Sequence, residues 1–140
     1  MAAFEELDHF LSLDFSDDFW SDEGVLHAHA LVQNLGEGEW PKLRASWTAR
    51  SEVWQIRCAD VLPEGAPQEV IPVLIQMVRN ASRDVCITAL DSLREFDLHQ
   101  LSVDEQRDID AAIERCLKSA DVAESAVLRS FANKLNVGAS

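Results

Sequence analysis

The sequence predicts an all-α fold, a short stack of about three helix hairpins with acidic helices capping its N-terminal end. Apolar residues recur at steps of three and four through most of the chain, the period that aligns side chains on one face of a helix. No segment alternates polar and apolar residues with period two, so no sheet is expected. Similar apolar seams recur on both sides of the segment 66–98, which indicates related hairpins.

Residues 1–39 are expected to form the acidic N-terminal helices. Within residues 1–15, apolar residues at helical spacing alternate with acids, which predicts an amphipathic helix. Residues 16–21 (SDDFWS) mix polar residues with two aromatics, which predicts a turn or irregular loop whose aromatics are either tucked into a groove or exposed. The next helix is expected over 22–35, with Gly36 as its stop.

Residues 40–65 are expected to form the first hairpin. Pro41 suits the first turn of a helix that runs through Trp47. Ser51 is expected to cap a second helix, whose seam repeats that of the central hairpin 31 residues earlier. The residues of this seam are Trp54, Cys58 and Leu62.

Residues 66–98 are expected to form the central hairpin. The apolar stripe of the first helix is wide, so this helix is expected to be buried on more than one side. Ser82 follows the turn and is expected to cap the second helix. The seam of the second helix consists of Val85, Ala89, Leu93 and Phe96. A hairpin cannot bury both of its apolar faces alone, which predicts a neighbouring hairpin on each side.

The central hairpin resembles a HEAT repeat. Its first helix carries an Ile-Pro pair near its start, Ile71 and Pro72, and its second carries a Val-Ala-Leu seam at four-residue steps. The resemblance implies a short HEAT-like α-solenoid. The family usually has Arg directly after the Val of the second helix, whereas this chain has Cys86, so the bonding between helices that the Arg supplies is not implied here.

Residues 99–137 are expected to form the third hairpin. Capping boxes, in which a polar cap residue and a Glu three positions later satisfy each other's amides, are expected at Ser102 and Asp121. The seam of the last helix falls 42 residues after the central one, at Val127, Phe131 and Leu135. Residues 136–140 are expected to be a frayed tail.

Length and composition favour one domain, residues 1–140, because 140 residues with 47% hydrophobic content suffice for an ordinary core. The sequence shows no secretory signal segment and no apolar run near the roughly 20 residues that a membrane helix needs. A cytoplasmic protein is therefore expected. Cys58, Cys86 and Cys116 lack CxxC spacing and are expected to be reduced core residues.

The net charge of −13 is concentrated near the N-terminus. Residues 1–41 hold ten acids and no Lys or Arg, whereas the remaining 99 residues hold 15 acids and 12 bases. Such a field repels nucleic acid and anionic membranes and attracts basic proteins. Neither a nucleic acid nor a membrane is therefore expected as a partner.

No arrangement of reactive residues indicates an enzyme, a cofactor or a metal site. Neighbouring acids such as Asp17 and Asp18 are more simply explained as solvated surface than as catalytic carboxylates. His27 and His29 lie two positions apart, so they point about 200° from each other on a helix and cannot share a metal. The sequence lacks the motifs of serine hydrolases, zinc peptidases, phosphate-binding loops and EF-hands. It predicts a binding protein, not an enzyme, without cofactor or metal.

A small, strongly acidic helical protein without catalytic groups resembles the bacterial immunity proteins of polymorphic and contact-dependent toxin systems, some of which use HEAT-like scaffolds. The resemblance implies a monomer that binds a cognate basic toxin domain, of the nuclease type, in a 1:1 complex and blocks its active site. Trp20 or Trp40 would supply an aromatic anchor. The acids that would meet Lys and Arg of the toxin are Asp14, Asp17, Asp18, Asp22, Glu23, Glu37 and Glu39.

Other interpretations fit the same pattern. The acids could serve only to keep the protein soluble. The alternative function is a generic HEAT-type scaffold or adaptor for protein–protein interaction, and a third is a chromophore lyase or chaperone-like helper. Binding through the concave face and binding through the N-terminal cap both remain open at this level.

Overall fold

The computed structural model describes residues 2–80, 82–99 and 101–139, with side chains described through residue 135. Within these ranges the regular structure is entirely helical and no strand occurs, which confirms the all-α prediction. None of the described helices combines the length and the apolar character needed to cross a membrane. The helices are α1 (Ala3–Leu11), α2 (Asp17–Phe19), α3 (Val25–Gln33), α4 (Trp40–Ser46), α5 (Glu52–Val61), α6 (Pro67–Asn80), α7 (Arg83–Leu93), α8 (Val103–Leu117) and α9 (Val122–Ala139).

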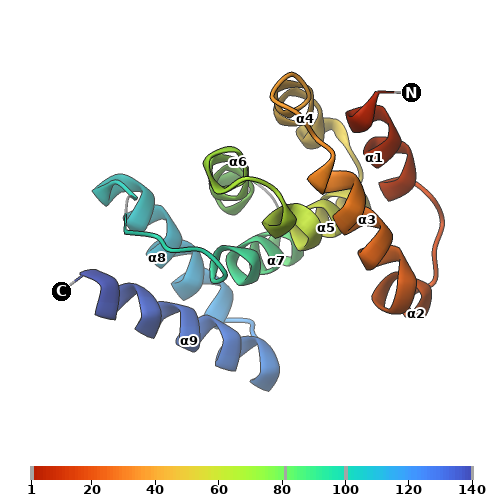
Figure 1. Ribbon diagram of the computed structural model, residues 1–140. Coiled ribbons are helices and arrows are strands. Elements are labelled where there is room, and N and C mark those ends of the chain that lie inside the picture. The colour runs from red at the N-terminus through yellow and green to blue at the C-terminus, as the bar shows by residue number, and fades with distance from the viewer. Residues whose placement is uncertain (1, 81, 100, 140) are drawn as a thin grey trace.

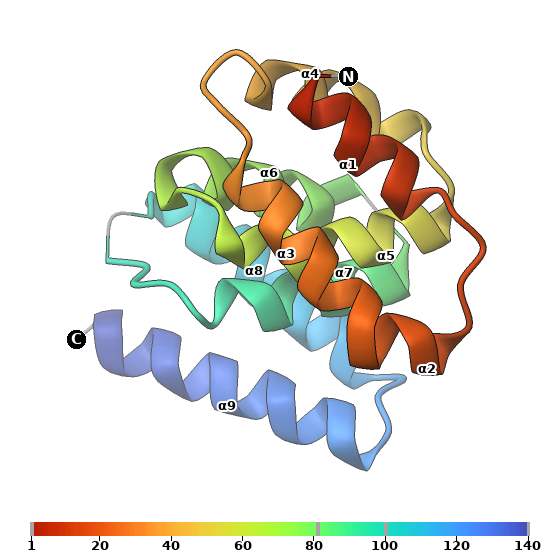
Figure 2. The same cartoon turned by 45° about the vertical axis from the view of Figure 1, so that its right-hand side comes forward.

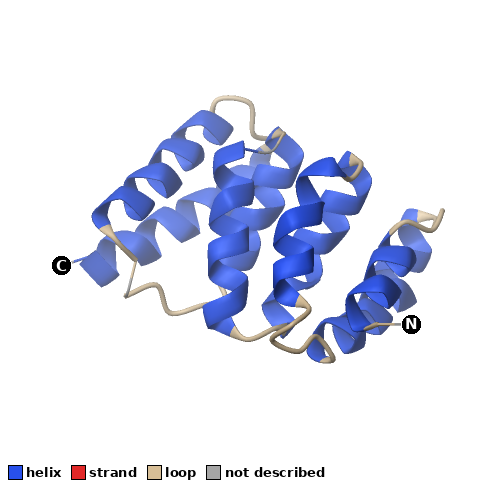
Figure 3. Cartoon of the chain, turned by 90° about the horizontal axis from the view of Figure 1, so that it is seen from above, coloured by secondary structure: helices blue, strands red, loops and turns tan. Residues whose placement is uncertain are grey.

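The helices pack side by side from the N-terminal end of the molecule to the C-terminal end (Figure 3). Helix α7 is central, since it contacts α5, α6, α8 and α9. Helix α3 contacts α5, and α6 contacts α8. Helices α1 and α9 therefore lie at opposite ends of the molecule (Figure 1).

The expected seams largely coincide with the core. In α7, Val85, Ala89 and Leu93 are fully buried, and the corresponding residues of α5 and its following 3-10 turn, Leu62–Glu64, are buried as well. In α9, Phe131 and Leu135 are buried as expected, whereas Val127 is only half-buried and its neighbour Leu128 is buried in its place. The expected seam of α9 is therefore confirmed at two of its three positions, and the third residue, Val127, faces a surface groove.

The helix caps agree with the sequence at three positions out of four. Ser51 accepts a hydrogen bond from the Trp54 amide, and both capping boxes are present, at Ser102 with Glu105 and at Asp121 with Glu124. Ser82 occupies the cap position of α7, but its side chain makes no capping hydrogen bond. The prediction for Ser82 is therefore right about the start of the helix and wrong about the capping hydrogen bond.

The segment predicted as a turn, residues 16–21, is helical instead. The Ser16 hydroxyl accepts a hydrogen bond from the Phe19 amide at 3.1 Å and so caps α2. A π-helical turn, Trp20–Gly24, then leads directly into α3. Polar residues that resemble a turn in sequence are here the cap and the acidic first turn of a helix, where negative charge is favourable.

Two other boundaries differ from the sequence-based expectation. Helix α3 ends at Gln33, two residues before the expected end at Leu35. At the other end of the chain, α9 continues through Ala139, where a frayed tail was expected from residue 136. Residues 136–139 contain no proline, so nothing in the sequence breaks the backbone hydrogen bonds of the helix.

Candidate functional site

An exposed group of acids surrounds α2 and the π turn at the N-terminal end of the molecule. Asp14 precedes α2, Asp17 and Asp18 form its first turn, and Asp22 and Glu23 lie in the π turn. All five are exposed, and in the part of the chain that the structure describes none of them forms an ion pair with a base. We call these five residues, Asp14, Asp17, Asp18, Asp22 and Glu23, the acidic corner.

Six of the twelve Lys and Arg residues form ion pairs with acids outside the acidic corner. Arg79 and Asp108 illustrate this, with their ion-pairing atoms 2.6 Å apart. Such pairs tie α4 to α6, α6 to α8 and α7 to α9, and they tie Arg50, just before α5, to α1. The pairs are Lys42 with Glu39, Arg44 with Glu69, Arg50 with Asp8, Arg79 with Asp108, Arg83 with Glu124 and Arg94 with Asp91.

Arg57 of α5 contacts the segment that carries the acidic corner and fixes its position. Its side chain is buried, and Nη1 donates hydrogen bonds to the carbonyls of Leu11 at 3.1 Å and Leu13 at 2.6 Å. The guanidinium also lies over the rings of Phe15 and Trp20, at 4.9 and 5.5 Å from their centroids. Because α1 ends at Leu11, Arg57 fixes the loop that connects α1 to α2.

Aromatic side chains form the base of the acidic corner. Phe15 stacks with Phe10 and Phe19, with ring centroids 4.9 Å apart in each pair. Trp20 is half-buried, and its indole N–H donates to the Asp60 carboxylate at 3.2 Å, whereas Phe19 is 40% exposed. The sequence analysis did not decide whether Phe19 and Trp20 are tucked into a groove or exposed. In the structure Trp20 is tucked against α5, whereas Phe19 remains largely exposed.

Gly24 permits this arrangement of Trp20. A Cβ atom at Gly24 would lie 3.0 Å from a ring atom of Trp20 and 3.5 Å from Phe19. Glycine is therefore the residue that lets the indole pack on the backbone of the π turn. Extra-residue turns of this kind occur often at functional sites, which is consistent with a role for this corner.

Glu37, Glu39 and Trp40 lie away from the acidic corner. They follow α3, whereas the corner precedes it, and the helical run from Asp17 to Gln33 is about 25 Å long at 1.5 Å per residue. Figure 2 shows α2 and the loop between α3 and α4 at opposite ends of this run.

Glu39 and Trp40, which were both expected to contact a partner, are engaged in contacts within the protein. The Glu39 carboxylate accepts a hydrogen bond from the Phe4 amide at 2.9 Å and pairs with Lys42, so it anchors the start of α1. Trp40 is only 3% exposed, and a Cβ atom at Gly65 would lie 2.7 Å from its ring. The ring therefore packs on the backbone of Gly65, and Trp40 is a core residue, not a partner anchor. Glu37 is exposed but isolated from the corner.

A surface groove that the sequence analysis missed adjoins the acidic corner at Trp20. It has a volume of about 420 Å³ and lies across α5, α7 and α9. We call it the α5–α7–α9 groove. The residues that line it are Trp20, Ile56, Asp60, Ile87, Thr88, Asp91, Ala123, Glu124 and Val127. The only signal in the sequence is that Ile56 and Ile87 each lie two residues after a core Trp or Val of their helix, off the main seam.

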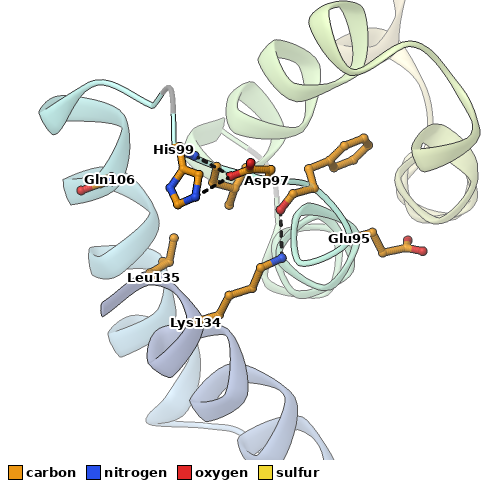
Figure 4. A pocket seen from close by; sticks show the side chains of 8 residues that line it. Glu95, Asp97, His99, Gln106, Lys134 and Leu135 are labelled. Atoms are coloured by element: carbon orange, nitrogen blue, oxygen red, sulfur yellow. Dashed lines mark hydrogen bonds and ion pairs between the residues drawn. The ribbon is translucent and has the colours of Figure 1, made fainter. Parts of the chain in front are cut away.

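A second cavity, of about 380 Å³, lies beside the segment between α7 and α8 (Figure 4). Lys134 of α9 reaches into it and donates hydrogen bonds to the carbonyls of Arg94 and Phe96. Asp97 and His99 on the opposite wall pair with each other at 3.3 Å. Lys134 is thus occupied in closing the C-terminal end of α7, a structural task.

The three cysteines are buried and free. Burial raises the pKa of Cys58, and burial together with the neighbouring Cys116 raises the pKa of Cys86 to about 12. A thiol with so high a pKa is almost entirely protonated near neutral pH and is a poor nucleophile. Within the described ranges, no group of three or more His, Cys, Asp and Glu residues is arranged to hold a metal ion.

No protein-family model, curated protein or solved structure matches this chain. The geometry of the acidic corner and of the groove beside it is therefore the basis for assigning a function.

Proposed function

We propose that the chain is an immunity-type inhibitor that binds and neutralises a cognate basic bacterial toxin, of the nuclease class, by covering its active site. The observation that carries this proposal is the acidic corner, in which five exposed carboxylates have no intramolecular cation among the described residues. A surface of this kind accelerates encounter with a basic partner and occupies sites that bind phosphate groups. The protein would act in the cytoplasm as a monomer in a 1:1 complex.

The arrangement of helices supports a HEAT-like α-solenoid as the scaffold. Helices α6 and α7 pack closely as a hairpin, and α3, α5, α7 and α9 contact each other in that order. This succession of neighbours is what stacked hairpins produce, because each hairpin buries its remaining apolar face on the next. The acidic corner would then belong to the N-terminal cap of the stack.

The proposal is tested by isolating the partner and then removing the charges. The tagged chain is purified from its native cells at low ionic strength, and the basic protein that accompanies it is identified, purified and expressed alone and with the chain. Expression of the partner alone is expected to arrest growth, and co-expression is expected to restore it. A harmless partner would favour the adaptor function instead.

A quadruple variant then tests the acidic corner itself. Asp17→Asn, Asp18→Asn, Asp22→Asn and Glu23→Gln together are expected to slow association with the purified partner roughly tenfold or more and to flatten its salt dependence. The matched control neutralises four exposed acids, one just after α7 and three on α8. It consists of Glu95→Gln, Asp104→Asn, Asp110→Asn and Glu114→Gln.

Both variants change the net charge equally, so a local binding surface predicts a large effect only for the first. Equal rates for the wild type and the acidic-corner variant, with the same dependence on salt, would sink the proposal. If the two variants slow association equally, the acidic corner contributes to the association rate only through the overall charge of the protein.

A further inference from the structure

The α5–α7–α9 groove exposes apolar side chains from three neighbouring helices. Ile56 of α5, Ile87 of α7 and Val127 of α9 are each half-buried, although the residues of the main seam beside them are fully buried. Trp20 of the π turn also lines the groove. These side chains therefore form a band across the stack that the described chain leaves open to solvent.

Charge around the groove favours a cationic occupant. Its lining includes three carboxylates, Asp60, Asp91 and Glu124, and no Lys or Arg. The Asp60 carboxylate bonds only the Trp20 indole among the described residues, while Asp91 and Glu124 pair with arginines that lie outside the lining. An anionic lipid surface or a nucleic acid is disfavoured by these carboxylates, and a basic protein segment is favoured.

The groove is continuous with the acidic corner through Trp20. This residue follows Asp17 and Asp18 by one turn of helix and also lines the groove. A partner held by the corner therefore has the groove within reach of its neighbouring side chains. Tight interfaces usually combine a buried apolar or aromatic centre with charges around it, and the groove adds apolar surface to the exposed Phe19 of the corner.

We propose that the α5–α7–α9 groove receives a large apolar side chain of the basic partner, flanked in the partner by Lys or Arg that meet Asp60 and the acidic corner. This inference rests on the proposed function and specifies how the partner is recognised. Charge brings the partner to the surface, and the apolar side chain in the groove slows its release.

Two synthetic peptides separate the groove from the corner. The first is built of Leu and Lys patterned as an amphipathic helix, and the second has every Leu replaced by Ser at the same charge. Binding to the full chain is followed by NMR, on the methyl groups of Ile87 and Val127 and on the amides of Asp17 and Glu23. The Leu/Lys peptide is expected to shift both sets of signals, and the Ser/Lys peptide only the amides of the corner.

A substitution that does not change the net charge provides a second test of the groove proposal. Ile87→Gln is expected to weaken binding of the Leu/Lys peptide roughly five- to tenfold, the effect of losing one buried aliphatic contact, and to leave the Ser/Lys peptide unaffected. Val103→Gln is the control, since Val103 is 65% exposed on α8 and lies outside the groove. Amide spectra of both variants verify that they fold.

The outcomes distinguish this inference from the function it rests on. If both peptides shift only the amides of the corner, to the same extent, the groove proposal is overturned and the acidic corner keeps its role. If neither peptide shifts any signal at the corner or the groove, both proposals fail together. A shift of the Val127 methyl signals that persists unchanged in Ile87→Gln also overturns the groove proposal.

Discussion

Asp8 and Arg50 form the best-defined ion pair at the N-terminal end. Arg50 donates to both Asp8 carboxylate oxygens, from Nε at 2.8 Å and from Nη2 at 2.7 Å, so the contact is bidentate. The hydrogen bond from Arg50 holds the pKa of Asp8 below its usual range, against the opposing effect of partial burial. Both side chains are partly buried, which together with the bidentate geometry makes this pair worth more than a fully exposed one.

The lowered pKa of Asp8 makes stability depend on pH in a defined direction. A carboxylate with a depressed pKa stabilises the fold above its unfolded pKa of about 4, and this stabilisation is lost as the pH falls through the lower, folded pKa. We expect Asp8→Asn to lower the free energy of unfolding by about 1 kcal/mol at neutral pH. The difference in unfolding free energy between the wild type and Asp8→Asn should decrease as the pH falls from about 5 to 2.

Urea unfolding at several pH values measures this effect. Asp14→Asn is the control, because Asp14 is exposed and has no ion-pair partner in the described ranges. A loss of stability in Asp8→Asn that is the same at neutral and acidic pH would mean that packing, and not the charge of Asp8, stabilises this contact.

Single residues also show where sequence reasoning stops. Trp54 is assigned to the core from its spacing and is buried, because the helix period decides the direction of its side chain. Trp40 begins its helix directly after a glycine-rich loop, where no period is yet established. Its burial depends on Gly65, a residue 25 positions away whose missing side chain makes room for the ring.

At the level of helices, local signals were the most reliable. The capping boxes were predicted correctly because all of their partners lie within four residues. The helical run at residues 17–24 was missed because its stability comes from distant contacts, chiefly Arg57 and the Trp20 bond to Asp60. The groove was missed for a similar reason, since it exists only where three helices meet.

Ser102 and Ser82 offer a matched test of capping. Both begin a long helix with nearly the same backbone angles, φ −68° and ψ 163° for Ser102 and φ −63° and ψ 167° for Ser82. Only Ser102 bonds the helix amides through its side chain. We expect Ser102→Ala to cost about 1 kcal/mol of unfolding free energy and Ser82→Ala clearly less.

Chemical denaturation measures the loss of unfolding free energy in Ser102→Ala and in Ser82→Ala. Equal losses would show that Ser82 also caps its helix in solution, through a rotation of its hydroxyl group. A smaller loss for Ser102→Ala than for Ser82→Ala would contradict the assigned hydrogen bonds.

For the whole molecule, the balance of charge sets the response to salt. The chain carries 25 acids and 12 bases, so repulsion among unpaired acids opposes the attraction within its surface ion pairs. We expect added NaCl to raise Tm by roughly 2–4 °C, because exposed pairs contribute little and long-range repulsion is screened within a Debye length.

Asp22→Asn with Glu23→Gln is expected to raise Tm at low salt and to reduce the gain on adding NaCl. These two acids lie beyond the first turn of α2, so removing them does not sacrifice favourable contacts with the helix N-terminus. Differential scanning fluorimetry across salt concentrations provides the measurement. A Tm that falls as NaCl is added would mean that the ion pairs outweigh the repulsion.

The π turn between α2 and α3 has a further consequence for how this surface can change in evolution. The amide of Val25 bonds the carbonyl of Trp20, five residues back, so the turn holds one residue more than an α-helical turn. Deleting a single codon there would restore a regular helix and rotate everything before it by about 100° relative to α3. Trp20 would then leave Asp60, and Asp17 and Asp18 would face another direction. One in-frame deletion can therefore abolish the acidic corner and displace α1, whose Phe4, Leu7 and Leu11 belong to the core.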